Sequence, residues 1–385
     1  MFYKGITSVK NKVILVVLFL LTFTNNTLTF ADGLLPLNDK GRTQQPESFG
    51  ENKKYGTKWH PGHYISLYPN QKEPYYFYSA MIDLRGNPSF KGMQKKYCWN
   101  KLEPSYGVYD FSEIRADLEN LARINKRLII TIQAESFITS EKLVPTYLLA
   151  SEYEGGVYPI NSGKGFNVAY YNHRVQDRLV ELLEALGREF DSHPNLEAVN
   201  LEETSPSRTE PEWHRAHIKN YISGMLRVSA AAKKSFPSTV VIQYVNYPES
   251  SLPLIVSTLK SAGIGMGGPD TYQNNTHLAK GVYTYYPKMS GVIPIGMGVD
   301  YHNYQSSVGG GGPFDKPSVS SIHQFAVIKL KPNYMFWLRR TKEPSNGSNY
   351  WQDVLNYFNH FDWKSDPTGG LNYTCPIAIA PCDTN

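Results

Sequence analysis

Short apolar runs alternate with helical stretches along most of this chain, and that alternation restricts the possible fold more than any other sequence feature. Eight runs are apolar enough to be strands buried on both faces, as the strands of a parallel sheet are. The predicted strands span residues 63–68, 93–99, 127–133, 196–203, 239–245, 263–267, 292–299 and 333–337.

Helical patterns occupy the segments between these runs. Predicted helices cover 168–190, 212–236, 252–262, 318–330 and 349–358, and one begins at Asp110, where Asp110 and Glu113 have the spacing of a capping box. Strand followed by helix, repeated about eight times over roughly 300 residues, predicts an α/β fold of the (β/α)8 TIM-barrel type. A doubly wound open sheet is the competing fold, but no Gly-x-Gly-x-x-Gly turn follows the first strand.

The ends of the chain differ from this pattern. Lys4, Lys10 and Lys12 precede a short apolar run and then Ala31, which is the order of a secretory signal peptide, with an uncleaved anchor as the alternative. We therefore expect a signal peptide at 1–31, an extended leader at 32–58, one barrel domain with long βα loops at 59–365 and a C-terminal tail at 366–385. The mature protein is expected to be secreted or periplasmic, with no membrane span after cleavage.

Composition limits the classes of partner. The net charge is +5, but the basic residues are scattered among acids, so a nucleic-acid partner is not expected. The glycine run 309–312 is not followed by Lys-Ser or Lys-Thr, and we predict no bound cofactor. Cys375 and Cys382 are placed to form a disulfide in an oxidising compartment, whereas Cys98 lies in an apolar run and is expected to be a buried thiol.

Barrel enzymes place their working groups at the carboxyl ends of the strands. Four carboxylates occupy such positions here: Glu202, Glu203, Asp270 and Asp300. One carboxylic acid that protonates a leaving oxygen, and a second that attacks or activates water, are what glycoside hydrolysis requires. The crowding of Glu202 and Glu203 would raise the pKa of one of them. We expect one of the two to face the mouth and the other to pair with a basic residue in the helix layer.

Further polar and aromatic residues near the strand ends are the candidates for holding a sugar. These candidate substrate-binding residues are His60, His63, Trp99, Glu135, Asn200, Tyr244, Tyr301, His302 and Trp337.

Residues 97–111 carry a more specific pattern. Trp99, Leu102, Glu103 and Pro104 are followed by Gly107 and by Tyr-Asp-Phe at 109–111. This segment resembles the second-strand region of the clan A glycoside hydrolases, and of their β-galactosidase-like families in particular. The resemblance implies a TIM-barrel glycosidase acting on an oligo- or polysaccharide. Within the segment, Glu103 is interpreted as one half of a loop ion pair.

The resemblance also implies roles for the strand-end carboxylates. Clan A enzymes carry the acid/base Glu at the end of strand four, usually directly after Asn, and here Glu203 matches best, with Glu202 as the alternative. Their nucleophile is a Glu at the end of strand seven, where this chain has Asp300, and Asp270 after strand six is the alternative base. Because Asp is one methylene shorter, a water-mediated, inverting reaction is favoured. Trp337 matches the strand-eight aromatic residue that floors the sugar subsite.

These observations lead to one principal hypothesis and two alternatives. The principal hypothesis is a secreted glycoside hydrolase with paired-carboxylate catalysis and no metal ion. The first alternative, based on the missing strand-seven Glu, is a barrel that binds glycan without cleaving it. The second is a metal-dependent barrel hydrolase in which His60 and His63 join Glu203, Asp300 or His302 as ligands.

Overall fold

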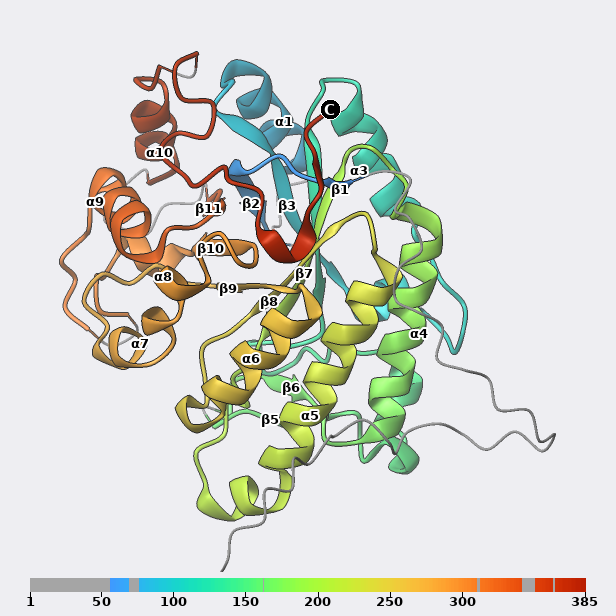
Figure 1. Ribbon diagram of the computed structural model, residues 1–385. Coiled ribbons are helices and arrows are strands. Elements are labelled where there is room, and N and C mark those ends of the chain that lie inside the picture. Colours follow the sequence, from blue (N-terminus) through green and yellow to red (C-terminus); the bar gives the residue numbers. More distant parts are fainter. Residues whose placement is uncertain (1–55, 69–75, 162, 310–311, 341–349, 363) are drawn as a thin grey trace, which may run out of the picture. The chain divides into compact units, whose positions relative to one another are not determined.

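A computed structural model describes residues 56–68, 76–161, 163–309, 312–340, 350–362 and 364–385 (Figure 1). The expected signal peptide, and the leader as far as residue 55, lie outside the described residues. Eight parallel strands form a closed barrel in the order β10-β11-β2-β3-β4-β7-β8-β9. The (β/α)8 barrel predicted from the sequence is therefore confirmed.

The barrel strands fall close to their predicted positions. Those at 127–133 and 196–203 match at both ends, and the others shift by one to three residues. The strands are β2 (Gly62–Leu67), β3 (Phe90–Cys98), β4 (Arg127–Gln133), β7 (Leu196–Glu203), β8 (Val240–Tyr244), β9 (Gly265–Gly268), β10 (Ile295–Val299) and β11 (Tyr334–Leu338).

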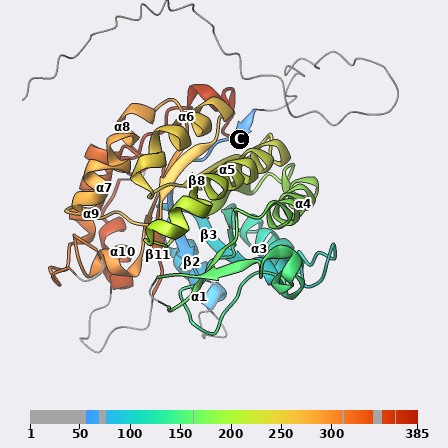
Figure 2. The same cartoon turned by 90° about the horizontal axis from the view of Figure 1, so that it is seen from below.

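Helices surround the strands, and Figure 2 shows the larger ones following one another around the barrel in chain order. They are α1 (Tyr76–Gly86), α3 (Ser112–Ala122), α4 (His173–Phe190), α5 (Pro211–Ser235), α6 (Leu252–Ala262), α9 (Val319–Phe325) and α10 (Tyr350–Phe358), with the shorter α2 (Trp99–Leu102), α7 (Thr276–Lys280) and α8 (Tyr286–Met289) between them. None of the helices in the described part of the chain combines the length and apolar character that a bilayer crossing requires.

Several helical details differ from the predictions. The helix predicted at 168–190 begins at His173, and the one predicted at 318–330 is an α-helix only over Val319–Phe325. Helix α1 was not predicted, although Tyr76, Ala80 and Leu84 recur at a spacing of four residues along its buried face.

Helix α3 begins at Ser112 rather than at Asp110, and its N-cap is Phe111, so the predicted capping box does not form. Asp110 Oδ1 instead accepts a hydrogen bond from the Ser112 amide at 3.0 Å, which satisfies one of the first amides of the helix.

The long connection after β4 contains regular structure in its described residues. It contains two short 3-10 helices, Thr146–Leu149 and Ser151–Tyr153, and an antiparallel hairpin of β5 (Val157–Pro159) and β6 (Phe166–Val168). The Ser136 and Phe166 backbones are also paired, so the hairpin is tied to the start of the loop. A structured wall therefore stands beside the carboxyl end of β4.

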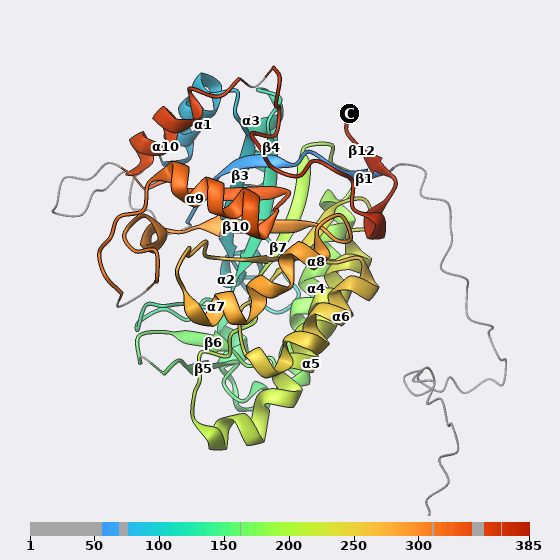
Figure 3. The same ribbon diagram turned by 60° about the vertical axis from the view of Figure 1, so that its left-hand side comes forward.

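The C-terminal segment returns to the start of the described barrel. Strand β12 (Cys382–Asp383) pairs in parallel with β1 (Thr57–Lys58), and Figure 3 shows the two side by side. Cys375 and Cys382 form a disulfide, and Cys98 is a buried free thiol, as predicted for all three cysteines. The disulfide thus fixes the segment that supplies β12.

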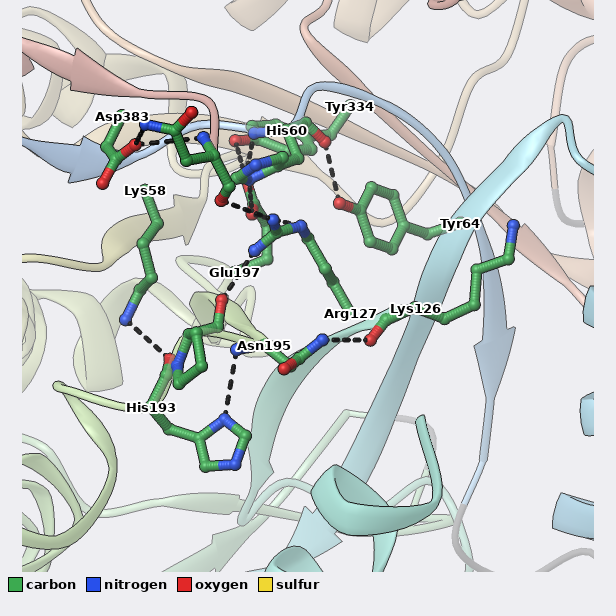
Figure 4. A network of polar contacts seen from close by, with 12 residues as sticks. Lys58, His60, Tyr64, Lys126, Arg127, His193, Asn195, Glu197, Tyr334 and Asp383 are labelled. Carbon is green, nitrogen blue, oxygen red and sulfur yellow. Dashed lines mark hydrogen bonds and ion pairs between the residues drawn. The ribbon is translucent and has the colours of Figure 1, made fainter. Parts of the chain in front are cut away.

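A buried carboxylate organises the amino-terminal end of the barrel (Figure 4). Glu197, near the start of β7, accepts hydrogen bonds from the His60 amide at 2.6 Å, from the Tyr334 hydroxyl at 2.7 Å and from His60 Nδ1 at 2.9 Å. Arg127 lies 4.0 Å away. Burial alone would raise the pKa of Glu197, but these hydrogen bonds and the His60 charge outweigh it and lower the pKa.

This network predicts a pH-dependent contribution to stability. Replacing the anion by Glu197→Gln leaves buried donors poorly matched, and we expect a loss of about 3 kcal/mol in the free energy of unfolding at pH 7. A carboxyl group with a lowered pKa stabilises the fold above its unfolded pKa, so the difference from wild type should shrink as the pH falls below about 4. Urea unfolding at pH 7 and pH 3.5 measures both effects.

Glu189→Gln is the matched control, since its ion pair with Arg115 lies at the surface. Glu189→Gln should lower the free energy of unfolding by less than about 1 kcal/mol. A Glu197→Gln protein as stable as this control at pH 7 would contradict the role given to Glu197.

Candidate active site

A cavity of about 560 Å³ lies at the carboxyl ends of the barrel strands. Its lining comprises Tyr68, Lys96, Thr131, Gln133, Glu135, Ser136, Phe137, Ile138, Glu141, Glu202, Glu203, Tyr244, Pro269, Asp270, Tyr272, Asp300, Tyr301, His302 and Arg340. A second cavity of about 270 Å³ adjoins it and shares Glu203, Pro269, Asp270 and Tyr272. We call the larger cavity the mouth pocket and the smaller one the side pocket.

A β-bulge brings two adjacent glutamates into the mouth pocket. Side chains alternate across a strand, so Glu202 and Glu203 would ordinarily point in opposite directions. The pairing of β7 with β8 shifts register between Leu201 and Glu203, which aligns Glu203 with Tyr244. Both glutamates consequently line the pocket, and the expectation that one of them would point into the helix layer is wrong.

Glu202 is fixed by the backbone of the neighbouring strand end. Its Oε2 accepts hydrogen bonds from the Ala134 and Glu135 amides, each at 2.8 Å. Burial raises the pKa of Glu202 to about 7, although the two amides and the Lys96 charge favour the ionised form. Glu202 is therefore a carboxylate held in place by its acceptor bonds.

Glu203 is held by a single side-chain amide. Asn246, just beyond β8, donates its Nδ2 hydrogen to Glu203 Oε2. Burial and the neighbouring Asp270 charge raise the pKa of Glu203 to about 7. At neutral pH a large fraction of Glu203 carries a proton, as a general acid must.

Asp270 lies beyond the end of β9 and lines both cavities with Glu203. Burial raises its pKa to about 6, while hydrogen bonds from Tyr272 and Asn303 and the charge of His302 oppose that rise. The Asn303 amide donates to Asp270 Oδ1 at 3.2 Å. Asp270 therefore loses its proton at a lower pH than Glu203.

Asp300 has a structural task at the end of β10. It is the N-cap of a 3-10 helix, Tyr301–Tyr304, and its side chain accepts a hydrogen bond from the Tyr301 amide. Asn303 completes the capping box by accepting from the Asp300 amide at 2.7 Å. The same Asn303 side chain thus ties Asp300 to Asp270. Burial raises the pKa of Asp300, although these backbone hydrogen bonds act to lower it.

Glu135 adds another carboxylate to the mouth pocket. It is buried at 3% exposure, and the Ser207 hydroxyl donates to its Oε1 at 3.2 Å. Burial and the charges of Glu203 and Glu202 raise the pKa of Glu135 well above its usual range. Of the predicted substrate-binding residues, Glu135, Tyr244, Tyr301 and His302 line this pocket.

The other five predicted substrate-binding residues lie outside the pocket, which corrects the sequence-based expectation. His60 is at the opposite end of the barrel, with Glu197. Trp337 donates to His63 Nδ1 at 3.0 Å, and both pack on Phe358 of α10, because strand alternation turns them toward the helix layer.

Trp99 and Asn200 are also fully buried away from the lining. Trp99 Nε1 donates to Glu103 at 2.9 Å. Asn200 is in register with Ile242 and with Thr131, which lines the pocket, but Asn200 is not part of the lining. Glu103 forms an ion pair with Arg178, so the interpretation of Glu103 as a structural loop residue is confirmed.

The positions of His60 and His63 also bear on a metal centre. Neither lines the pocket with Glu203, Asp300 or His302. Among the described residues, no group of three or more His, Cys, Asp or Glu side chains is arranged to hold a metal ion. The ligand set considered from the sequence is therefore not assembled.

Two cations in the mouth pocket were missed by the sequence analysis. Lys96 Nζ lies 4.1 Å from the centre of the Tyr68 ring, and the Arg340 guanidinium lies 3.7 Å from that of Tyr301. Burial lowers the pKa of Lys96, while the surrounding carboxylates oppose that change. The sequence feature that could have indicated Lys96 is a lysine pair, Lys95-Lys96, inside a strand buried on both faces. Alternation sends Lys95 to Asp117 of α3 and Lys96 into the barrel.

The chain has the fold of the TIM-barrel glycoside hydrolases. Similar solved structures include the catalytic domain of the β-amylase from Paenibacillus polymyxa, at 10% identity and a TM-score of 0.51, which covers 78% of this chain and 98% of that one. The β-galactosidase from Bacillus circulans sp. alkalophilus is 10% identical, with a TM-score of 0.54, and the match covers 80% of this chain and 56% of that one. The β-galactosidase from Rahnella sp. R3 is 11% identical, with a TM-score of 0.55, and the match covers 82% of this chain and 57% of that one.

These likenesses confirm, at the level of the fold, the resemblance to clan A glycoside hydrolases that residues 97–111 indicate. The chain spans little more than half the length of the two β-galactosidases. No model of a known family and no curated protein matches its sequence.

The contact between Asn246 and Glu203 gives a prediction about titration. Removing the amide donor by Asn246→Ala destabilises the ionised form, so the pKa of Glu203 should rise above about 7. Carbon-13 NMR of glutamate carboxyl groups, assigned with Glu203→Gln, measures the shift. Asn359→Ala, at a site that pairs with Asn87, is the control. An unchanged or lower pKa in Asn246→Ala would show that this hydrogen bond does not stabilise the anion.

Proposed function

We propose that the protein is a secreted glycoside hydrolase in which Glu203 is the general acid and Asp270 is the second carboxylate. The observation that carries this proposal is their joint position on the wall shared by the two cavities. A glycan that occupied both cavities would place a glycosidic bond beside this pair. The likeness in fold to β-amylase and β-galactosidase supports a carbohydrate ligand.

The two pKa values suit the two roles. Glu203, with a pKa of about 7, is available to protonate the leaving oxygen, while Asp270, with a pKa of about 6, is ionised over most of the neutral range. Asp270 then activates a water molecule or attacks the anomeric carbon. Glu202, held by two amides and with a pKa of about 7, supplies negative charge beside the sugar ring in the molecules in which it is ionised.

Asp270 is preferred to Asp300 on structural grounds. Asp300 accepts from the Tyr301 amide as a helix cap, so its carboxylate is turned toward backbone. Within the described part of the chain, the donors to the Asp270 carboxylate are side chains, those of Tyr272 and Asn303. Because an Asp reaches less far than the usual Glu, we propose that water enters between Asp270 and the sugar and that the configuration is inverted.

Variants of the carboxylates test these roles. Glu203→Gln removes the proton donor and should lower kcat by about a thousandfold, and Asp270→Asn should have a comparable effect. Asp300→Asn should lower kcat far less, and the surface variant Glu152→Gln should have the kcat of wild type. Release of reducing sugar from a panel of bacterial and plant polysaccharides is the assay. Full activity in Glu203→Gln would refute its role as the acid.

The pH dependence of kcat/KM is a separate test. Activity requires Asp270 ionised and Glu203 protonated, so it should fall below about pH 6 and above about pH 7, giving a narrow bell. Proton NMR of the first anomer released distinguishes inversion from retention. A flat profile between pH 5 and 8 would contradict the assignment of the pair.

The absence of Glu at the end of β10 favours a second candidate function, glycan binding without cleavage. The residue there, Asp300, is used as a helix cap. If polysaccharides bind but none of the panel is hydrolysed, this second function replaces the first.

A further inference from the structure

The charges around the mouth pocket are separated by strand. Arg340 follows β11, Tyr68 follows β2 and Lys96 lies on β3, and these three strands are consecutive in the barrel. Glu135 follows β4, Glu202 and Glu203 end β7, and Asp270 follows β9. The pocket therefore has a cationic, aromatic side across from the proposed catalytic pair, and this side is flanked by Asp300 after β10, the neighbour of β11.

The two cations have no acidic partner at close range. No carboxylate of the described residues lies within ion-pair distance of Lys96 or Arg340, and no side-chain or backbone acceptor there is hydrogen-bonded to either. By contrast, the neighbouring Lys95 bonds Glu113 at 2.7 Å and contacts Asp117 at 2.5 Å. Lys96 and Arg340 are held instead by the faces of Tyr68 and Tyr301, which leave their hydrogens available.

The Lys96 ammonium and the Arg340 guanidinium favour one class of ligand. Ammonium and guanidinium groups only donate hydrogen bonds, and charge-assisted bonds to anionic oxygens are the strongest they make. Asp300 follows β10, the neighbour of β11, and the Arg340 charge opposes the rise in its pKa, but its carboxylate caps the Tyr301 helix. A neutral sugar would give neither cation a direct ionic partner, because the carboxylates that act on Lys96 and Arg340 lie beyond ion-pair distance.

We propose that Lys96 and Arg340 form a subsite for an anionic substituent, so that the substrate is an acidic glycan whose ring carries a carboxylate or a sulfate. This inference rests on the proposed carbohydrate function but not on catalysis. With the anionic group between Lys96 and Arg340, the sugar ring extends across the pocket toward Glu203 and Asp270. The charge separation then orients the ring and keeps its anionic group away from the proposed catalytic pair.

Binding of matched sugars tests the proposal without requiring turnover. The probes are the methyl glycosides of glucuronic acid and glucose, of galacturonic acid and galactose, of galactose 6-sulfate, and of glucosamine as a cationic probe. Dissociation constants come from NMR titration of wild type and Glu203→Gln. We expect at least one acidic sugar to bind about tenfold or more tightly than its neutral partner in both proteins. The carboxylate and sulfate members distinguish the two sources of the anion.

Substitutions assign the preference to the two cations. Lys96→Met and Arg340→Met should each reduce the preference for the acidic sugar by about tenfold, whereas Lys96→Arg should keep most of it. Lys101→Met, an exposed lysine on α2 outside both cavities, is the matched control. Equal unfolding midpoints identify losses that do not come from misfolding, and the preference should weaken with added salt.

Three results would overturn the proposal: neutral or cationic probes that bind at least as tightly as the acidic ones, failure of every acidic probe to bind, or a preference unchanged in both Met variants. A preserved acidic preference together with no hydrolysis would instead overturn the proposed hydrolase and leave the anionic subsite intact. The two proposals can therefore fail separately.

Discussion

Alternation of side chains across the strands of a closed barrel is the constraint on which this structure depends. A residue that faces inward near a carboxyl end belongs to the mouth pocket, and its neighbour packs against the helices. Lys96 and Lys95 show the two outcomes side by side, with one in the pocket and the other bonded to α3. The bulge at Glu202 is a local exception, and it places two adjacent glutamates on the same side.

The carboxylates of the pocket share one electrostatic cause. Partial burial raises the pKa of Glu202, Glu203 and Asp270, and hydrogen bonds of different number and kind then separate their behaviour. Backbone amides hold Glu202, a single side-chain amide holds Glu203, and Tyr272 with Asn303 holds Asp270. Glu202 and Glu203 thereby reach a pKa of about 7, and Asp270 a pKa of about 6, within one cavity.

The sequence was sufficient to predict the barrel, most strand positions and the four strand-end carboxylates, because buried parallel strands read as continuous apolar runs. The sequence was insufficient to predict whether a side chain on a strand faces the pocket or the helix layer. Trp337 and His63 belong to the correct strands but face the helices, and Trp337 is tied to His63 there. Lys96 was overlooked because it lies inside a run interpreted as apolar, and only the closed barrel shows it facing the glutamates. No local pattern predicts the bulge that turns Glu203 inward.

The pairing of β1 with β12 has a consequence for the connectivity of the chain. Thr57 aligns with Cys382, so the first and last strands of the described residues, which form a two-stranded sheet outside the barrel, are neighbours in space. Domains with adjacent ends tolerate circular permutation, since a short linker can replace the natural break. Opening the chain at another loop would leave the cyclic order of the eight barrel strands unchanged.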